Sequence, residues 1–151
     1  MILAAIDIGS NAARLLITET SPYKDGTVDF TKLNLLRIPL RLGMDVFDKG
    51  YVSDVKKRKL IETLKTYKLM MDIYDVSAFK ACATSAMRDA TNGPEILKEI
   101  KEETGLEIKI ITGDEEANII YETHIAENLS LNKSYMYIDV GGGSTEITMF
   151  S

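Results

Sequence analysis

The sequence has 151 residues, of which 45% are hydrophobic and 27% are charged, and its net charge is −5. This acidic balance argues against binding to a nucleic-acid polymer, which usually needs a basic surface, but a local pocket can still hold an anion. No apolar run reaches about 18 residues, as a membrane span requires, and the first residues lack a signal-peptide pattern. A single cysteine, Cys82, cannot form an internal disulfide, so we expect a cytoplasmic protein with no membrane partner.

Extended segments are expected in the N-terminal part of the chain. Residues 2–8 form a short apolar run typical of a buried strand, and a second strand is expected over residues 13–20 after the turn signal at residues 9–11. Residues 28–40 are again extended in character, where Pro39 favours an edge strand or a strand end.

Helices and strands then alternate. A helix is expected to begin at Ser53, as its cap, and to end near Tyr74, because apolar residues recur along it at spacings of three and four. Residues 76–84 are typical of a strand. Residues 85–90 favour a short helical turn.

Capping patterns open the next helix. Asn92 is followed three residues later by Glu95, which is the pattern of a capping pair. The helix is expected to end at Gly105, since glycine commonly follows the last helical turn. Residues 106–112 alternate between apolar and polar side chains and predict a strand.

A second capping pair, Thr112 and Glu115, opens a helix over residues 114–127. Two further strands are expected over residues 135–140 and 145–150, on either side of a glycine-rich turn. Strands followed by alternating helices and strands indicate an α/β fold class.

One pattern occurs twice in the chain. IDIGSNAARLLI (residues 6–17) and IDVGGGSTEITM (residues 138–149) each contain a strand, an aspartate, an apolar residue, a glycine, a polar turn and a second strand. Because two copies in matching register are much stronger evidence than one hairpin, the repeat predicts a pair of related loops.

The composition of these turns favours anion binding. Glycines let a ligand approach the backbone closely, and consecutive free N–H groups form an anion-binding concavity. An aspartate before each turn would repel phosphate unless a cation lies between, so Asp7 and Asp139 are candidate Mg²⁺ ligands. The structural alternative is two tight hairpins with capping aspartates. The loop residues expected to bind phosphate are Gly9, Ser10, Asn11, Gly141, Gly142, Gly143, Ser144 and Thr145.

Paired Asp-x-Gly hairpins resemble the two phosphate loops of the actin-like ATPase and sugar-kinase superfamily. More narrowly, DIGSNAARLL, RIPLRLG, ATSAMRDATN, ITGDEEANIIYE and DVGGGSTEIT occur in this order and resemble the exopolyphosphatase/guanosine pentaphosphate phosphohydrolase family over nearly the whole chain. The resemblance implies a ribonuclease H-like α/β lobe, with a mixed sheet flanked by helices, and the first hairpin of a second similar lobe.

The resemblance also implies roles for single residues. Glu116 matches a glutamate that orients or activates the attacking water, whereas the sequence by itself favours an acid at a helix N-terminus. Glu146 matches an acidic residue associated with metal binding or with the water, and is therefore both a catalytic and a metal-ligand candidate. Arg88 matches an arginine that faces phosphate, where a surface arginine is the alternative. Arg14 and Arg41 are weaker candidates for the same role.

The activity implied is metal-assisted hydrolysis of a terminal phosphoanhydride in polyphosphate or guanosine pentaphosphate. Two N–H-rich loops and Mg²⁺ would neutralise the transferred phosphoryl group, and a carboxylate would align the water. A phosphotransferase of the same superfamily and a non-catalytic polyphosphate or nucleotide-binding module stay open as alternatives. One departure from the family is Ala12, which stands where a serine is usual and removes one donor from the first loop.

Members of that family are longer and hold two similar lobes with the active site between them. By this resemblance, residues 1–127 form the first lobe, residues 128–134 a linker, and residues 135–151 the opening hairpin of a truncated second lobe. Two strands alone do not make an independent domain. We therefore expect the hairpin to pair with another chain, giving a homodimer, or to fold back on the first lobe, and we expect weak or no activity from this chain alone.

Overall fold

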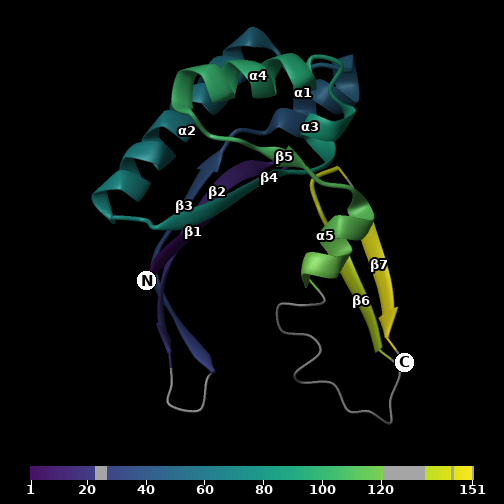
Figure 1. Ribbon diagram of the computed structural model, residues 1–151. Helices are drawn as coiled ribbons and strands as arrows, with labels where there is room; N and C mark the ends of the chain where they lie inside the picture. The colour runs from purple at the N-terminus through teal and green to yellow at the C-terminus, as the bar shows by residue number, and fades with distance from the viewer. Residues whose placement is uncertain (23–26, 121–134, 144, 151) are drawn as a thin grey trace.

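The computed structural model describes residues 1–22, 27–120, 135–143 and 145–150 of the chain (Figure 1). Strands and helices alternate from β4 onward, as the sequence predicts for an α/β fold. The elements are, in chain order, β1 (Ile2–Ile8), β2 (Ala12–Pro22), β3 (Val28–Pro39), α1 (Leu42–Lys49), α2 (Asp54–Ile73), β4 (Ala78–Ala83), α3 (Ser85–Asp89), α4 (Gly93–Thr104), β5 (Lys109–Ile110), α5 (Gly113–Ile120), β6 (Tyr135–Val140) and β7 (Thr145–Phe150).

A five-stranded mixed sheet organises the N-terminal part, in the order β3-β2-β1-β4-β5. The first three strands form an antiparallel meander, in which Asp7 lies opposite Arg14. β4 then joins β1 in parallel, because the chain crosses over through α1 and α2 before it returns to the sheet. The carboxyl ends of β1 and β4 therefore meet at one edge of the sheet, where the turn at residues 9–11 also lies.

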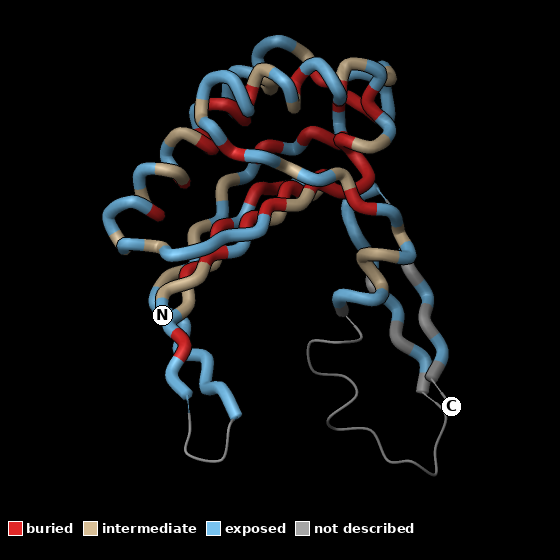
Figure 2. Tube along the Cα trace, in the orientation of Figure 1, coloured by how far each residue is buried: buried red, intermediate tan, exposed pale blue. Residues whose placement is uncertain are grey.

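The core lies between one face of the sheet and helices α1 to α4 (Figures 1 and 2). Alternate residues of β1 and β2 point into it, and Ile8, Leu15 and Ile17 are fully buried. The predicted apolar face of α2 covers them, with Leu64 and Tyr67 both at 0% exposure. The spacing of three and four therefore predicted this helix and its buried face correctly.

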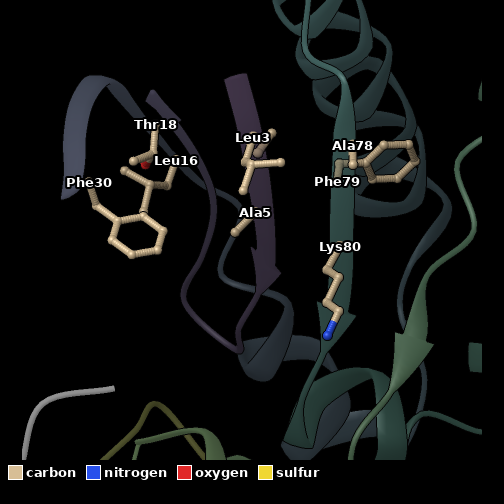
Figure 3. A pocket seen from close by; sticks show the side chains of 9 residues that line it. Leu3, Ala5, Leu16, Thr18, Phe30, Ala78, Phe79 and Lys80 are labelled. Carbon is tan, nitrogen blue, oxygen red and sulfur yellow. The ribbon is translucent and has the colours of Figure 1, made fainter. Parts of the chain in front are cut away.

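The opposite face of the sheet is open. It carries an apolar hollow of about 430 Å³ near the amino ends of β1 and β4 (Figure 3). The residues that line the hollow are Leu3, Ala4, Ala5, Leu16, Thr18, Phe30, Ala78, Phe79 and Lys80. Thr18 and Lys80 are the polar members of this lining, and Asp7 stands further along β1, toward its carboxyl end.

Two predicted helix caps are wrong in their contacts, although both residues stand at the N-cap position. The Ser53 hydroxyl donates to Asp45 Oδ2 at 2.5 Å instead of capping α2. The Asn92 side chain instead bonds the backbone of Val52 through both its oxygen and its nitrogen, at 3.0 and 2.8 Å. In both cases a tertiary partner replaces the local one. The predicted end of α4 is confirmed, since Gly105 adopts φ 70° and donates to the carbonyl of Lys101.

Two other differences concern element lengths. Helix α1 was not predicted, although Gly50, with φ 80°, ends it in the usual left-handed conformation. The strand expected over residues 106–112 is reduced to Lys109–Ile110, because only these two residues pair with β4. The part of the last helix predicted beyond Ile120 and the predicted linker lie outside the described residues.

β6 and β7 form a separate two-stranded sheet beside α5 (Figure 1). Its register matches that of the first hairpin, since Asp139 lies opposite Glu146 as Asp7 lies opposite Arg14. The predicted repeat is therefore confirmed as a structural repeat. Across the described ranges, no helix combines the length and apolar character needed to cross a membrane.

Candidate functional site

The first loop, residues 9–11, is held by its carbonyl groups. The carbonyl of Asn11 accepts from the N–H of Arg41 at 2.8 Å, and that of Ser10 accepts from the N–H of Gly43 at 2.9 Å. Within the described part of the chain, the N–H groups of Ser10 and Asn11 have no backbone acceptor. The residues that begin α1 thus fix the loop while two amide donors stay available for an anion.

Ser10 is buried at 4% exposure, and its hydroxyl shares a 2.8 Å hydrogen bond with the hydroxyl of Ser85. Ser85 begins α3, directly after β4. This bond fastens the first loop to the end of the neighbouring parallel strand. The Ser10 side chain is therefore engaged within the protein, and its expected contribution to anion binding falls to its backbone.

The second loop approaches the first so closely that a side chain at two of its positions would meet a neighbouring side chain. A Cβ atom at Gly142 would lie 2.5 Å from Asn11 Nδ2. A Cβ atom at Gly143 would lie 1.9 Å from Cζ of Phe47, on α1. Because a Cβ atom at either position would require the Asn11 or Phe47 side chain or the loop to move, these glycines allow the turn of the second hairpin to rest on the first loop and on α1.

Both loops line one cavity of about 180 Å³. Segments from six parts of the chain meet there: β1, the two loops, the start of β2, the end of β4 and α5. The lining residues are Asp7, Gly9, Ser10, Asn11, Ala12, Arg14, Thr84, Ser85, Glu116, Val140, Gly141 and Gly142. Seven residues named from the sequence as loop, metal or catalytic candidates are in this set: Asp7, Gly9, Ser10, Asn11, Glu116, Gly141 and Gly142.

Glu115 and Glu116 are neighbours with different positions. Glu115 closes the predicted capping box, since its carboxylate accepts from Thr112 N at 3.0 Å and its N–H donates to Thr112 Oγ1 at 3.2 Å. The Lys109 ammonium, and then the Thr112 backbone, lower the pKa of Glu115 below its usual value. Glu116 lines the cavity, and one of its carboxylate oxygens is buried. Only Glu116 can therefore face a bound ligand.

Asp7 and Arg14 form an ion pair at the mouth of the cavity, with Arg14 Nη1 3.1 Å from Asp7 Oδ2. Their side chains are 45% and 56% exposed, so solvent screens the pair. Arg14, named as a weaker candidate, is thus beside the loops because the hairpin register sets it opposite Asp7.

Arg88 and Arg41 do not reach this cavity. Arg88 Nη1 donates to the carbonyl of Ile111 at 2.9 Å, and Arg88 Nε lies 3.8 Å from Asp89 Oδ1. Arg41 is exposed in a left-handed conformation, φ 54°, at the N-cap of α1, where its carbonyl accepts from Lys56. Arg88 therefore joins α3 to the segment before α5 in this structure.

Thr84 and Ser85 are cavity residues that the sequence did not single out. Both are buried, at 7% and 3% exposure. Their position at the end of a predicted strand could have identified them, since the carboxyl ends of parallel strands commonly carry functional residues.

Part of the predicted site lies outside the residues that the structure describes. Nothing is described for Ser144 or for the side chains of Asp139 and Glu146. Gly143 rests on Phe47, and Thr145 is exposed as the first residue of β7. In the described residues, no group of three or more His, Cys, Asp or Glu side chains is placed to hold a metal ion. Two carboxylates, those of Asp7 and Glu116, nevertheless line the same cavity.

The sequence of this chain is similar to proteins of one known family. Residues 23–151 match the Ppx/GppA phosphatase family. The chain belongs to the Ppx/GppA phosphatase family. A bifunctional 3-dehydroquinate synthase/phosphatase of Fusobacterium nucleatum is 33% identical over 150 residues, which are 97% of this chain and 22% of that protein. Exopolyphosphatase 1 of Mycobacterium tuberculosis is 27% identical, over 98% of this chain and 42% of that protein.

Solved structures of Ppx/GppA proteins agree with this fold. The Aquifex aeolicus PPX-GPPA enzyme superposes with a TM-score of 0.81 at 35% identity, over 99% of this chain and 48% of that chain. An exopolyphosphatase from Cytophaga hutchinsonii gives a TM-score of 0.87 at 26% identity, over 99% and 46%. The predicted actin-like ATPase fold is therefore confirmed. The chain spans less than half the length of each of these four relatives.

Proposed function

We propose that this chain carries the phosphate-binding and water-activating part of a cytoplasmic phosphoanhydride hydrolase. The substrate would be inorganic polyphosphate, guanosine pentaphosphate or both, and the reaction would release the terminal phosphate. The observation that carries the proposal is the cavity in which both glycine loops meet the carboxylates of Asp7 and Glu116. Exopolyphosphatases among the relatives support the same class of reaction.

The chemistry of the cavity suits a terminal phosphoryl group. The amide N–H groups of Ser10 and Asn11 have no backbone acceptor among the described residues and are suited to hydrogen-bond its oxygens, and Arg14 adds positive charge. Glu116 enters from α5 and has a buried carboxylate oxygen, so it is suited to accept a proton from water. The loops would then bind the terminal phosphoryl group, and the Glu116 carboxylate would orient the attacking water.

Mg²⁺ fits the donors present in the cavity. Magnesium is usually held by one or two carboxylates together with waters and substrate phosphates, and Asp7 and Glu116 provide hard oxygen ligands. We propose Asp7 as the described ligand, with Asp139 and Glu146 on the second hairpin as further ones. When bound, the ion would neutralise charge on the phosphates.

The two adjacent glutamates provide the test. Glu116→Gln should lower phosphate release from polyphosphate by about a hundredfold, because it removes the general base. Glu115→Gln is the matched control, since glutamine keeps the capping box and the residue does not line the cavity. The same Mg²⁺-containing assay is run on both variants and on the wild type.

Binding is measured in parallel, because we expect little turnover from this chain alone. Calorimetry with orthophosphate and tripolyphosphate should show binding to the wild type and, within about threefold, to E116Q. Where the wild type releases phosphate measurably, equal release from E116Q and E115Q would contradict the role of Glu116. A wild-type chain that binds neither ligand would contradict the phosphate site itself.

We also propose that the second hairpin contacts a second copy of the chain. Five of its described exposed side chains are large and apolar, with exposed fractions of 52% to 74%: Met136, Ile138, Val140, Ile147 and Met149. Surfaces of this kind usually mark an interaction site. Light scattering over a range of concentrations should show a dimer, and a monomer at every concentration would contradict this proposal.

A further inference from the structure

Two arginines face each other across β2 and β3. Arg14 and Arg37 are direct partners in the antiparallel register, so their side chains project from the same face of the sheet. Asp7 lies opposite Arg14 on the other side, which makes a row of three charged residues across β3, β2 and β1. Arg14 lines the cavity, and Arg37 therefore stands one strand further out.

This pair is unfavourable for the fold by itself, since like charges placed directly opposite one another destabilise a sheet. Asp7 compensates Arg14 through the 3.1 Å ion pair. Arg37 is exposed, and the described residues include no salt bridge to it. Its same-face neighbours along β3 are Leu35 and Pro39, neither of which carries a charge. Nothing in the packing of the sheet therefore accounts for a second cation at this position.

The pair is also confined to the end of the sheet that carries the loops. Two residue pairs further from the loops, and on the same face, Leu16 lies opposite Leu35, and Leu16 lines the apolar hollow (Figure 3). Positive charge thus extends from the cavity sideways, across β2 to β3, and not along the sheet face. A residue that is unfavourable for local structure and gains no compensating contact is expected at a functional site.

We propose that Arg14 and Arg37 form a second anion subsite, which binds the phosphate groups that follow the terminal one in an extended phosphate chain. This inference rests on the proposed function, because it assumes that the terminal phosphate occupies the cavity. Arg14 spends only Nη1 on Asp7 in the described contacts, so its remaining guanidinium N–H groups can bond a phosphate. Among the residues that the structure describes, none forms a salt bridge with Arg37, so its guanidinium N–H groups can also bond a phosphate. Two adjacent guanidinium groups suit successive phosphates, since each can bind phosphate oxygens in a bidentate way.

The test compares ligands of different length on matched variants. Arg37→Gln should weaken tripolyphosphate binding to the 151-residue chain about fivefold, measured by calorimetry with Mg²⁺, and should leave orthophosphate binding within about twofold. Lys32→Gln is the control, because Lys32 is an exposed cation on the same strand but lies roughly 16 Å from Arg37 along it. Arg37→Lys keeps the charge and should recover part of the lost affinity.

Thermal unfolding separates this role from a structural one. Removing one of two opposed cations should leave the Tm of R37Q equal to that of the wild type or above it. A lower Tm, an equal loss of affinity for both ligands, or the same loss in K32Q would overturn the subsite. A wild type that binds orthophosphate and tripolyphosphate while R37Q behaves identically would overturn the subsite alone. A wild type that binds neither would instead contradict the proposed function.

Discussion

The two Asp-x-Gly hairpins share a sequence pattern and a register, but their surroundings are opposite. In the first, Ile6 pairs with Leu15, and both side chains are buried at 2% and 0% exposure. In the second, the equivalent pair is Ile138 and Ile147, which are 52% and 63% exposed (Figure 2). The local sequence thus determines the hairpin, and the elements packed against it determine whether its apolar face becomes core.

The cover of the first hairpin comes from distant parts of the chain. Tyr67 of α2 donates its hydroxyl to the carbonyl of Ala13 at 2.8 Å, and burial raises the pKa of this hydroxyl to about 12. The second hairpin is held to the rest of the molecule by its glycine turn on Asn11 and Phe47, and by α5 beside β7. One hairpin is therefore part of a core, and the other is attached mainly by its tip.

The hairpins also differ in charge at one equivalent position. Asp7 lies opposite Arg14, whereas Asp139 lies opposite Glu146. The first pair joins opposite charges in an ion pair, whereas the second places two acidic residues at paired backbone positions. The repeat therefore places a basic residue at this position of the first hairpin and an acidic residue at the same position of the second.

The largest expected effect comes from truncating equivalent core and surface positions. Leu15→Ala should cost about 3 kcal/mol in the free energy of unfolding, because it leaves a cavity in a fully buried site. Ile147→Ala should cost less than about 1 kcal/mol, since the side chain is 63% exposed. Urea unfolding followed by circular dichroism measures both, as the chain has no tryptophan.

Equal costs for these two substitutions would contradict the comparison. They would mean that the second hairpin is covered in solution, and a dependence of the Ile147→Ala effect on protein concentration would identify a second copy as the cover. A small effect at both positions would instead show that the first hairpin is not part of the core.

A smaller effect is expected from the cluster that fastens α1 and α2 over the first hairpin. Asp45 is buried, and the hydroxyl of Ser53, followed by the ammonium of Lys56, holds its pKa well below the usual range. Asp45→Asn should cost about 2 kcal/mol at neutral pH, because it removes these charged hydrogen bonds.

The stabilisation by the charged Asp45 side chain should depend on pH. Since the folded pKa is depressed, Asp45 stabilises the protein fully above the ordinary carboxyl pKa of about 3.9 and loses this contribution as the pH falls further. The gap between wild type and D45N should therefore shrink below about pH 4. Asp48→Asn, on the exposed side of the same helix, should change stability by less than about 0.5 kcal/mol at any pH. A gap that stays constant down to pH 2 would contradict the charged role.

Features that depend on neighbouring residues were predictable from the sequence. The repeat of residues 6–17 in 138–149, the buried face of α2 and the Thr112–Glu115 capping box all follow from patterns within a few positions. The two copies of the hairpin predicted two related glycine loops, and both loops line one cavity in the structure. These predictions rest on periodicity and turn chemistry, which the fold does not override here.

Features that depend on distant partners were not predictable. Ser53 and Asn92 have the composition of caps, but Asp45 and the Val52 backbone compete for their side chains across the fold. Arg88 donates to the carbonyl of Ile111, a contact between distant residues that no local pattern in the sequence indicates. A single sequence does not show which distant residues lie close together. It therefore predicted local capping contacts at positions where the side chain bonds a distant residue.

The smallest effect on stability, and the sharpest on binding, is expected at the tip of the second hairpin. Gly143→Ala places a methyl group 1.9 Å from Cζ of Phe47, so either the ring or the loop must move. Because Phe47 is 47% exposed, the move should cost less than about 1 kcal/mol of unfolding free energy. Displacing the loop should nevertheless weaken tripolyphosphate binding about tenfold, or 1.4 kcal/mol. Phe47→Ala in the same chain should restore the affinity to that of Phe47→Ala alone, since it removes the obstructing ring. If the double variant binds no better than Gly143→Ala, the ring is not the obstacle, and the attachment of the second hairpin to α1 lies elsewhere.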